Sequence, residues 1–217
     1  MTPPWYKQAT TAFFSHWWLK AFGIPVLIGV FFAAYFYLLK NPAYPITVVP
    51  LIGLDRLIGF QPLALPLYLS IWVYVSLPPA LLTTRRELMT YALAMAATCL
   101  AGLIVFYFWP TTVPVSDIDW SPNVNLLKHL DASGNACPSL HVATAAFSCV
   151  WLNHLLRRLI APCWTRVLNW AWFVGIAYST VAIRQHVAVD VLAGLTLGML
   201  AGYLSLRTRA NTKISGA

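Results

Sequence analysis

The segment STVAIRQHVAVDVLAGLTLGMLAG, which runs from Ser179 to Gly202, decides the fold because it joins charged groups to an apolar run. Its first half carries Arg184, His186 and Asp190 among apolar residues. Ionisable groups at membrane depth usually face the protein interior or a wet cavity. Its second half is suited to crossing a bilayer. We therefore expect a functional site at the mouth of a membrane-spanning helix.

The spacing within this segment indicates how one helix face is used. His186 and Asp190 are four residues apart, which predicts that they lie on one face of a helix. Gly194, Gly198 and Gly202 continue at the same spacing. A ridge of small residues lets a neighbouring helix approach closely. One face is therefore expected to offer a histidine–carboxylate pair at its end and tight packing below it.

The composition of the whole chain is that of an integral membrane protein. Of 217 residues, 59% are hydrophobic and only 9% are charged, whereas about one quarter of a soluble domain is charged. The length predicts one domain over residues 1–217. The net charge of +8 is spread over short loops, so we expect no nucleic-acid partner. The four cysteines have no CxxC spacing, which argues against a zinc or disulfide framework.

We expect an all-α fold in which six transmembrane helices form one bundle. Each predicted span approaches the ~20 residues that cross a bilayer, and the spans cover residues 22–39, 63–82, 88–109, 138–156, 168–183 and 187–206. Residues 1–21 are rich in tryptophan and tyrosine, which predicts an interfacial lead-in. Residues 110–136 form the one long polar loop, and residues 207–217 form a tail.

The basic residues predict the orientation of this bundle. Six spans place both termini on one side, and that side carries ten basic residues: Lys7, Lys20, Arg85, Arg86, Arg157, Arg158, Arg166, Arg207, Arg209 and Lys213. The other side carries four: Lys40, Arg56, Lys128 and Arg184. The positive-inside rule then places both termini in the cytoplasm and the 110–136 loop at the outer face. We expect a multi-pass protein of a bacterial inner membrane, with its site facing the periplasm or exterior.

A second short segment, CPSLH at residues 137–141, is expected to join this site. Proline is favoured at the first position of a helix, so Pro138 predicts the start of the fourth span. The backbone N–H groups near Ser139 and Leu140 would then form an anion site. His141 would lie in the first turn beside it, at the same membrane face as His186 but on a different helix.

These residue types suit phosphoryl transfer. One histidine can attack phosphorus and the other can protonate the leaving oxygen, while a carboxylate orients the first ring and stabilises the cation that forms. Arginine and backbone N–H groups can hold the phosphoryl oxygens. The bilayer would supply a lipid phosphate as substrate by lateral diffusion.

CPSLHVA followed by SxxxxxxHxxxDxxxG resembles the type 2 phosphatidic acid phosphatase and vanadium haloperoxidase superfamily. The second family motif, PSxH, is matched by Pro138, Ser139 and His141. The third, SRxxxxxHxxxD, is matched by Ser179, His186 and Asp190. The resemblance implies that His186 is the nucleophile, that His141 is the acid for the leaving group, and that Asp190 is the partner of His186.

The chain departs from the family pattern in its cations. Thr180 stands where the family usually has arginine, and the first motif, KxxxxxxRP, is not present. Arg184 is the first candidate to replace these cations, Arg56 the second and Lys128 the third. The segments "RQH…DVLAG" and "GLDRLIGFQP…LPLY" resemble the inositol phosphorylceramide synthase branch and its bacterial relatives.

Several roles stay open from the sequence. Ser139 and Ser179 are candidate phosphate-binding residues, but either hydroxyl can instead cap a helix or bond back to it. His186 with Asp190 can be a buried ion pair that only packs helices. Two histidines and one carboxylate also suit a metal site, although we expect neither a metal nor another cofactor.

The predicted function is metal-independent hydrolysis of a lipid phosphomonoester or diphosphate through a phosphohistidine intermediate. Undecaprenyl diphosphate, phosphatidylglycerol phosphate and phosphatidate all present this chemistry. The first alternative is a lipid phosphotransferase with an alcohol acceptor, similar to inositol phosphorylceramide synthase. The second is a non-catalytic transporter with the same fold. The sequence does not indicate an oligomeric state.

Overall fold

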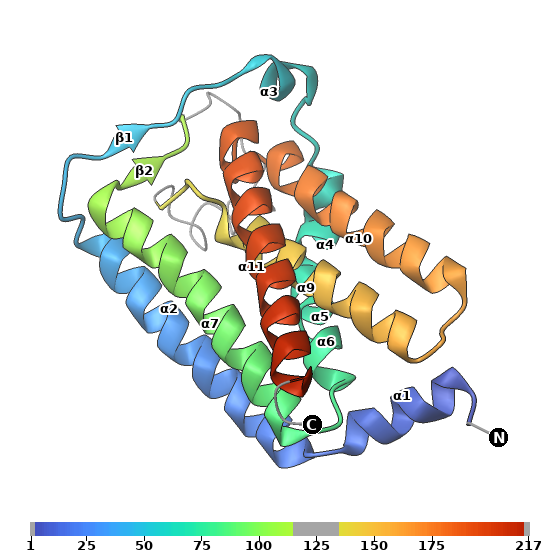
Figure 1. Cartoon of the computed structure of the whole chain (residues 1–217). Coiled ribbons are helices and arrows are strands. Elements are labelled where there is room, and N and C mark those ends of the chain that lie inside the picture. Colours follow the sequence, from blue (N-terminus) through green and yellow to red (C-terminus); the bar gives the residue numbers. More distant parts are fainter. Residues whose placement is uncertain (1–2, 115–134, 215–217) are drawn as a thin grey trace.

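The computed structural model of the chain describes residues 3–114 and 135–214 (Figure 1). The long helices are α1 (Trp5–Phe14), α2 (Ile24–Lys40), α7 (Arg85–Phe108), α9 (Leu140–Arg158), α10 (Cys163–Ala182) and α11 (Ala188–Ile214). The short elements are η1 (Leu19–Gly23), α3 (Gly53–Leu57), η2 (Pro62–Ala64), α4 (Leu65–Leu69), α5 (Ile71–Tyr74) and α6 (Leu77–Ala80). The expected mainly helical fold is confirmed, with one addition: the two-residue strands β1 (Thr47–Val48) and β2 (Thr111–Thr112) pair in parallel.

Four segments of the described chain are long and apolar enough to cross a membrane: Leu19–Lys40, Pro62–Ala80, Arg85–Phe108 and Ala188–Arg207. They correspond to the first, second, third and sixth predicted spans. The fourth and fifth predicted spans are α9 and α10, whose 19 and 20 residues are of spanning length but which are not among these four. Thirteen residues of α9 are buried, so protein rather than lipid surrounds most of this helix.

The second apolar segment, Pro62–Ala80, is built from a series of short helices instead of one continuous helix. Pro66, Pro78 and Pro79 lie within it, and proline lacks the N–H that would continue the helical hydrogen bonds. One carbonyl that Pro79 leaves without its helical donor, that of Val75, accepts a hydrogen bond from the Tyr91 hydroxyl of α7 at 3.4 Å. A neighbouring helix thus satisfies part of the broken backbone, as membrane proteins require.

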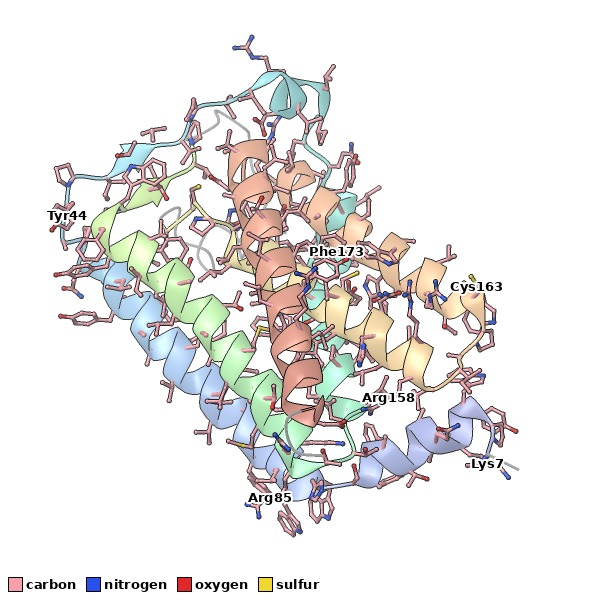
Figure 2. The ribbon with its side chains drawn as sticks, viewed as in Figure 1. Lys7, Tyr44, Arg85, Arg158, Cys163 and Phe173 are labelled. Atoms are coloured by element: carbon pink, nitrogen blue, oxygen red, sulfur yellow. The ribbon has the colours of Figure 1, made fainter. Side chains whose placement is uncertain are left out.

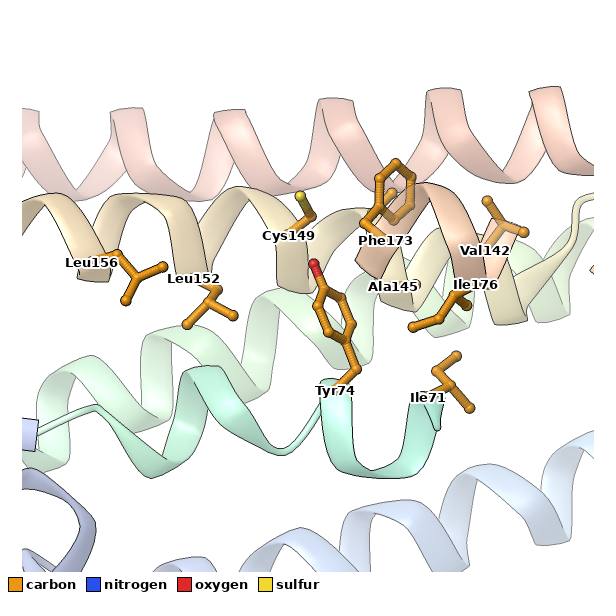
Figure 3. Close-up of a cluster of buried hydrophobic side chains, with 10 residues drawn as sticks. Ile71, Tyr74, Val142, Ala145, Cys149, Leu152, Leu156, Phe173 and Ile176 are labelled. Atoms are coloured by element: carbon orange, nitrogen blue, oxygen red, sulfur yellow. The ribbon is translucent and has the colours of Figure 1, made fainter. Parts of the chain in front are cut away.

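The main core lies between α5, α9 and α10 (Figure 3). Its apolar side chains surround Tyr74, whose hydroxyl donates to Asn169 Oδ1 at 2.7 Å. The Asn169 amide in turn donates to the Cys149 carbonyl at 3.1 Å. Because buried polar groups are costly without partners, this network fixes how α5, α9 and α10 face one another.

The two ends of the bundle differ in charge. Figure 2 shows Lys7 and Arg85 towards the end where α1 lies, whereas Tyr44 lies near the strands at the opposite end. At the α1 end, Arg158 pairs with Glu87 at 2.6 Å, and the Lys20 ammonium donates to carbonyls that end α1 and α6. The strands, α3 and the first turn of α11 gather at the other end, where the candidate site lies (Figure 1).

Candidate active site

The start of α9 is built by Ser139, which caps the helix. Its hydroxyl accepts the Val142 N–H at 3.3 Å, and the side chain is fully buried. The Ser139 N–H donates to the Asp190 carbonyl at 3.0 Å. The predicted helix start at Pro138 is therefore two residues early, because the serine cap rather than the proline begins the helix. The Ser139 N–H, one of the backbone donors in the predicted anion site, is already used by the Asp190 carbonyl of α11.

His186 and Asp190 come together through a turn, not along a helix face. His186 lies before α11, and its N–H donates to the Thr180 carbonyl at 3.1 Å. Asp190 lies in the first turn of α11 and its Oδ2 accepts the Val187 N–H at 3.2 Å. This arrangement is one half of a capping box. The expected shared helix face is thus wrong, since the cap requires a non-helical residue before Ala188.

The histidine–carboxylate pair itself is present and buried. His186 Nδ1 lies 3.6 Å from Asp190 Oδ2, and the two side chains are 12% and 0% exposed. This distance is longer than a hydrogen bond but within ion-pair range. Both His186 Nδ1 and Asp190 Oδ1 are buried without a hydrogen-bond partner among the described residues.

His141 lies in the first turn of α9 and stacks on Tyr68 of α4. The ring centroids are 4.1 Å apart and the planes differ by 12°. His141 Nε2 is buried without a hydrogen-bond partner among the described residues. Because the bond between Ser139 and Asp190 joins the two helix starts, His141 and His186 lie at the same end of the bundle, as the sequence predicts.

The glycine ridge of α11 brings the two helix starts together. A Cβ at Gly194 would overlap the Ser139 carbonyl, and one at Gly198 would overlap the Ala143 carbonyl. Gly202 faces Val150, again on α9. The predicted close approach of a neighbouring helix is confirmed, and that neighbour is the helix that carries His141.

Asp55 is a site residue that the sequence interpretation missed. It is fully buried, and its Oδ1 accepts the Ala188 N–H at 2.7 Å while its Oδ2 accepts the Ile52 N–H at 2.8 Å. One carboxylate thus ties α3 to the first turn of α11, beside His186. The sequence did offer one indication of this role. Asp55 is an acidic residue in a largely apolar chain, and a carboxylate is costly to bury unless it is hydrogen-bonded.

Arg184 also contacts Asp55, the residue that ties α3 to α11. It adopts a left-handed backbone with φ 61°, and its Nη1 donates to the Asp55 carbonyl at 3.0 Å. The Gln61 N–H donates to the Ala182 carbonyl at 2.8 Å. Arg184 Nε is buried without a partner among the described residues. The Arg184 guanidinium is therefore anchored to Asp55, two residues along the chain from His186, and still has N–H donors that no described residue uses.

The other predicted phosphate-binding residues are not brought to the histidines by any described contact. The Ser179 hydroxyl bonds back to the Ile176 carbonyl at 2.6 Å, and the Thr180 hydroxyl bonds back to that of Ala177 at 2.8 Å. Arg56 is exposed on α3. Lys128 lies outside the described residues.

Two further features concern metals and thiols near the site. Within residues 3–114 and 135–214, no three His, Cys, Asp or Glu side chains cluster as a metal site would require. Burial and, to a lesser extent, the neighbouring Asp190 carboxylate raise the pKa of the Cys137 thiol to about 11. Cys137 therefore stays neutral beside the carboxylate at neutral pH.

Comparison with known proteins agrees with the motifs. A model of the PAP2 superfamily matches residues 86–214, which is more than half of the chain and contains His141, His186 and Asp190. No curated protein and no solved structure matches the chain. On this match, the chain is a member of the PAP2 superfamily, the type 2 phosphatidic acid phosphatases and their relatives.

Proposed function

We propose that this protein is a membrane-embedded phosphatase that hydrolyses a lipid phosphomonoester or diphosphate. The observation that carries the proposal is the buried contact between His186 and Asp190 at 3.6 Å, next to the start of the helix that carries His141. Membership of a superfamily of phosphatases and phosphotransferases supports the reaction class. The apolar spans support a substrate drawn from the bilayer.

In the proposed reaction, His186 attacks phosphorus and the bond from phosphorus to the leaving oxygen breaks. Asp190 faces Nδ1 of His186, so it holds the proton there and leaves Nε2 as the nucleophile. His141 gives its proton to the leaving oxygen. Water then attacks phosphorus, the bond from phosphorus to His186 breaks, and His141 accepts the proton of that water as inorganic phosphate is released.

The phosphoryl oxygens need cationic or N–H partners, and Arg184 is our first choice. One of its donors is used by the Asp55 carbonyl, and its Nε has no partner among the described residues. The N–H groups of Leu140 and His141 are the second choice. They open α9 and therefore have no acceptor within the helix, and a helix N-terminus favours an anion.

We also propose that the chain crosses the membrane six times, with α9 and α10 as the fourth and fifth spans. This gives both termini a cytoplasmic location and places the histidines at the outer face of a bacterial inner membrane. Two observations support the proposal. The ten-to-four distribution of basic residues follows the positive-inside rule, and α1 and the last turns of α11 lie at the same end of the bundle (Figure 1).

The experiment that tests the function is a panel of lipid phosphates presented to the full chain in detergent with EDTA. We expect release of inorganic phosphate from at least one lipid. His186→Ala should abolish release and trap no phosphate on the protein. His141→Ala should lose about 10²–10⁴-fold on the lipid but retain activity on p-nitrophenyl phosphate, whose leaving group needs little protonation.

Three outcomes would contradict this assignment. Activity of His186→Ala on the activated ester, with His141→Ala inactive on both substrates, would reverse the two histidine roles. Loss of activity in EDTA with recovery in zinc would favour a metal site. Head-group transfer to an added alcohol without phosphate release would favour the phosphotransferase related to inositol phosphorylceramide synthase.

A further inference from the structure

A groove between α9 and α10 lies away from the histidines. Its volume is about 470 Å³, and its lining includes Arg157 and Arg166 at one end, Asn153 one turn further into α9, and Val167, Trp170 and Val174 further along α10. At 1.5 Å per helical residue, Arg157 lies about 24 Å along α9 from His141. The groove is therefore separate from the candidate active site.

The lining changes from charged to apolar along the groove. Arg157 lies in the last turn of α9 and Arg166 in the first turn of α10, at the end that Cys163 marks in Figure 2. Val167 and Val174 follow towards the middle of α10 and are 63% and 59% exposed. This order matches a phospholipid, whose charged head group lies at the interface and whose acyl chain continues into the membrane.

The two arginines have no counter-charge within the described residues. The carboxylates described are those of Asp55, Glu87 and Asp190, and each is engaged elsewhere, by α11, by Arg158 and by His186 respectively. Arg166 Nε is buried without a hydrogen-bond partner there. Buried donors without partners are costly, so the groove favours an anion that brings its own acceptors.

We propose that this groove binds an anionic phospholipid in the leaflet at the α1 end of the bundle. The head-group phosphate lies between Arg157 and Arg166, each of which can give charge-assisted hydrogen bonds. One acyl chain follows Trp170, Ala171 and Val174 along α10. Basic pockets between membrane helices are a general mode of anionic lipid recognition. The proposal does not depend on the catalytic assignment.

The test uses the purified full chain in detergent, titrated separately with phosphatidylglycerol, phosphatidylcholine and glycerol 3-phosphate. Native mass spectrometry measures retained ligand, and thermal unfolding measures stabilisation. We expect phosphatidylglycerol alone to be retained and to raise the Tm. The double variant R157Q/R166Q should weaken retention about tenfold or more. Ala171→Phe, at an exposed position, should weaken it by filling the apolar part without changing charge.

The matched control is R85Q/R86Q, which removes the same charge from two exposed arginines at the same end. It should retain phosphatidylglycerol as the wild type does. Equal losses in both double variants would overturn the proposal in favour of general electrostatic attraction. Equal retention of phosphatidylcholine would overturn the role of the arginines, and equal retention of glycerol 3-phosphate would overturn the role of the acyl chain.

Discussion

Replacing Asp55 by asparagine tests whether α3 holds the segment that carries His186. The carboxylate accepts two backbone N–H groups, those of Ala188 and Ile52, at 2.7 and 2.8 Å. Asparagine keeps one acceptor oxygen, so one charged hydrogen bond is lost, at about 1.5–3 kcal/mol. At about 2–4 °C per kcal/mol for a chain of this size, the Tm should fall by about 3–12 °C.

The effect on turnover should exceed the effect on folding. Ala188 is two residues from His186, and a displacement of about 1 Å in a catalytic group can reduce the rate about 10²-fold. We therefore expect kcat to fall by about that factor while KM changes little, because no part of Asp55 is expected to touch the substrate. The assay is phosphate release at equal amounts of folded protein, alongside thermal unfolding in detergent.

Glu87→Gln is the matched control for the loss of one carboxylate. Glu87 pairs with Arg158 at the opposite end of the bundle, so its loss leaves the contacts of His186 unchanged. Its kcat should stay at the wild-type value. If Asp55→Asn has the Tm and the kcat of the wild type, α3 does not position His186 and the reasoning is refuted.

Three further predictions follow from the packing, the cation and the topology. Gly198→Ala places a Cβ on a carbonyl of α9 and should destabilise the fold by about 1–3 kcal/mol in denaturant unfolding, whereas Gly29→Ala meets no atom within 4 Å and should not. Arg184→Ala should lose most turnover, and Arg184→Lys should recover only part because an ammonium cannot bind two oxygens in a fork; near-normal turnover of the alanine variant would exclude Arg184. With Cys163 as the only native cysteine, an impermeant thiol reagent on intact cells should label Leu57→Cys but not Cys163, and the reverse pattern would invert the topology.

The candidate site was predictable from the sequence to the extent that its chemistry depends on local motifs. The motifs identified His141, His186 and Asp190, and a backbone bond from Ser139 to Asp190 joins the start of α9, which carries His141, to the start of α11, which carries Asp190 and directly follows His186. The structural reason for the HxxxD spacing was not predictable from the sequence. Two residues four apart can lie on one helix face, but the same spacing arises when the first residue precedes the helix cap and the second caps the helix. The physical role of Asp190 became clear only from its bond to the Val187 N–H.

Contacts between distant parts of the chain had no local signal. The carboxylate of Asp55 and the ring of Tyr68 reach the histidine segments across 133 and 73 positions of the sequence, and no periodicity encodes such contacts. The broken second span is different, because Pro78 and Pro79 indicated the break before the structure did. Hydropathy alone does not reveal this break, because the apolar residues on either side of the prolines favour a continuous helix.

The hydrogen bond from α11 to α3 and the ring contact between α4 and His141 also bear on how the proposed enzyme selects its substrate. The PAP2 match covers residues 86–214, whereas Asp55 and Tyr68 both precede it. The part of the chain that the superfamily describes thus contains the proposed reacting groups, His141 and His186, and the unmatched residues 1–85 supply Tyr68, on which His141 stacks. Redesign of the proposed enzyme for another lipid tail therefore has a natural boundary: α4 and its neighbours can vary, while His141 and the segment that carries His186 and Asp190 stay joined by the bond from Ser139 to Asp190.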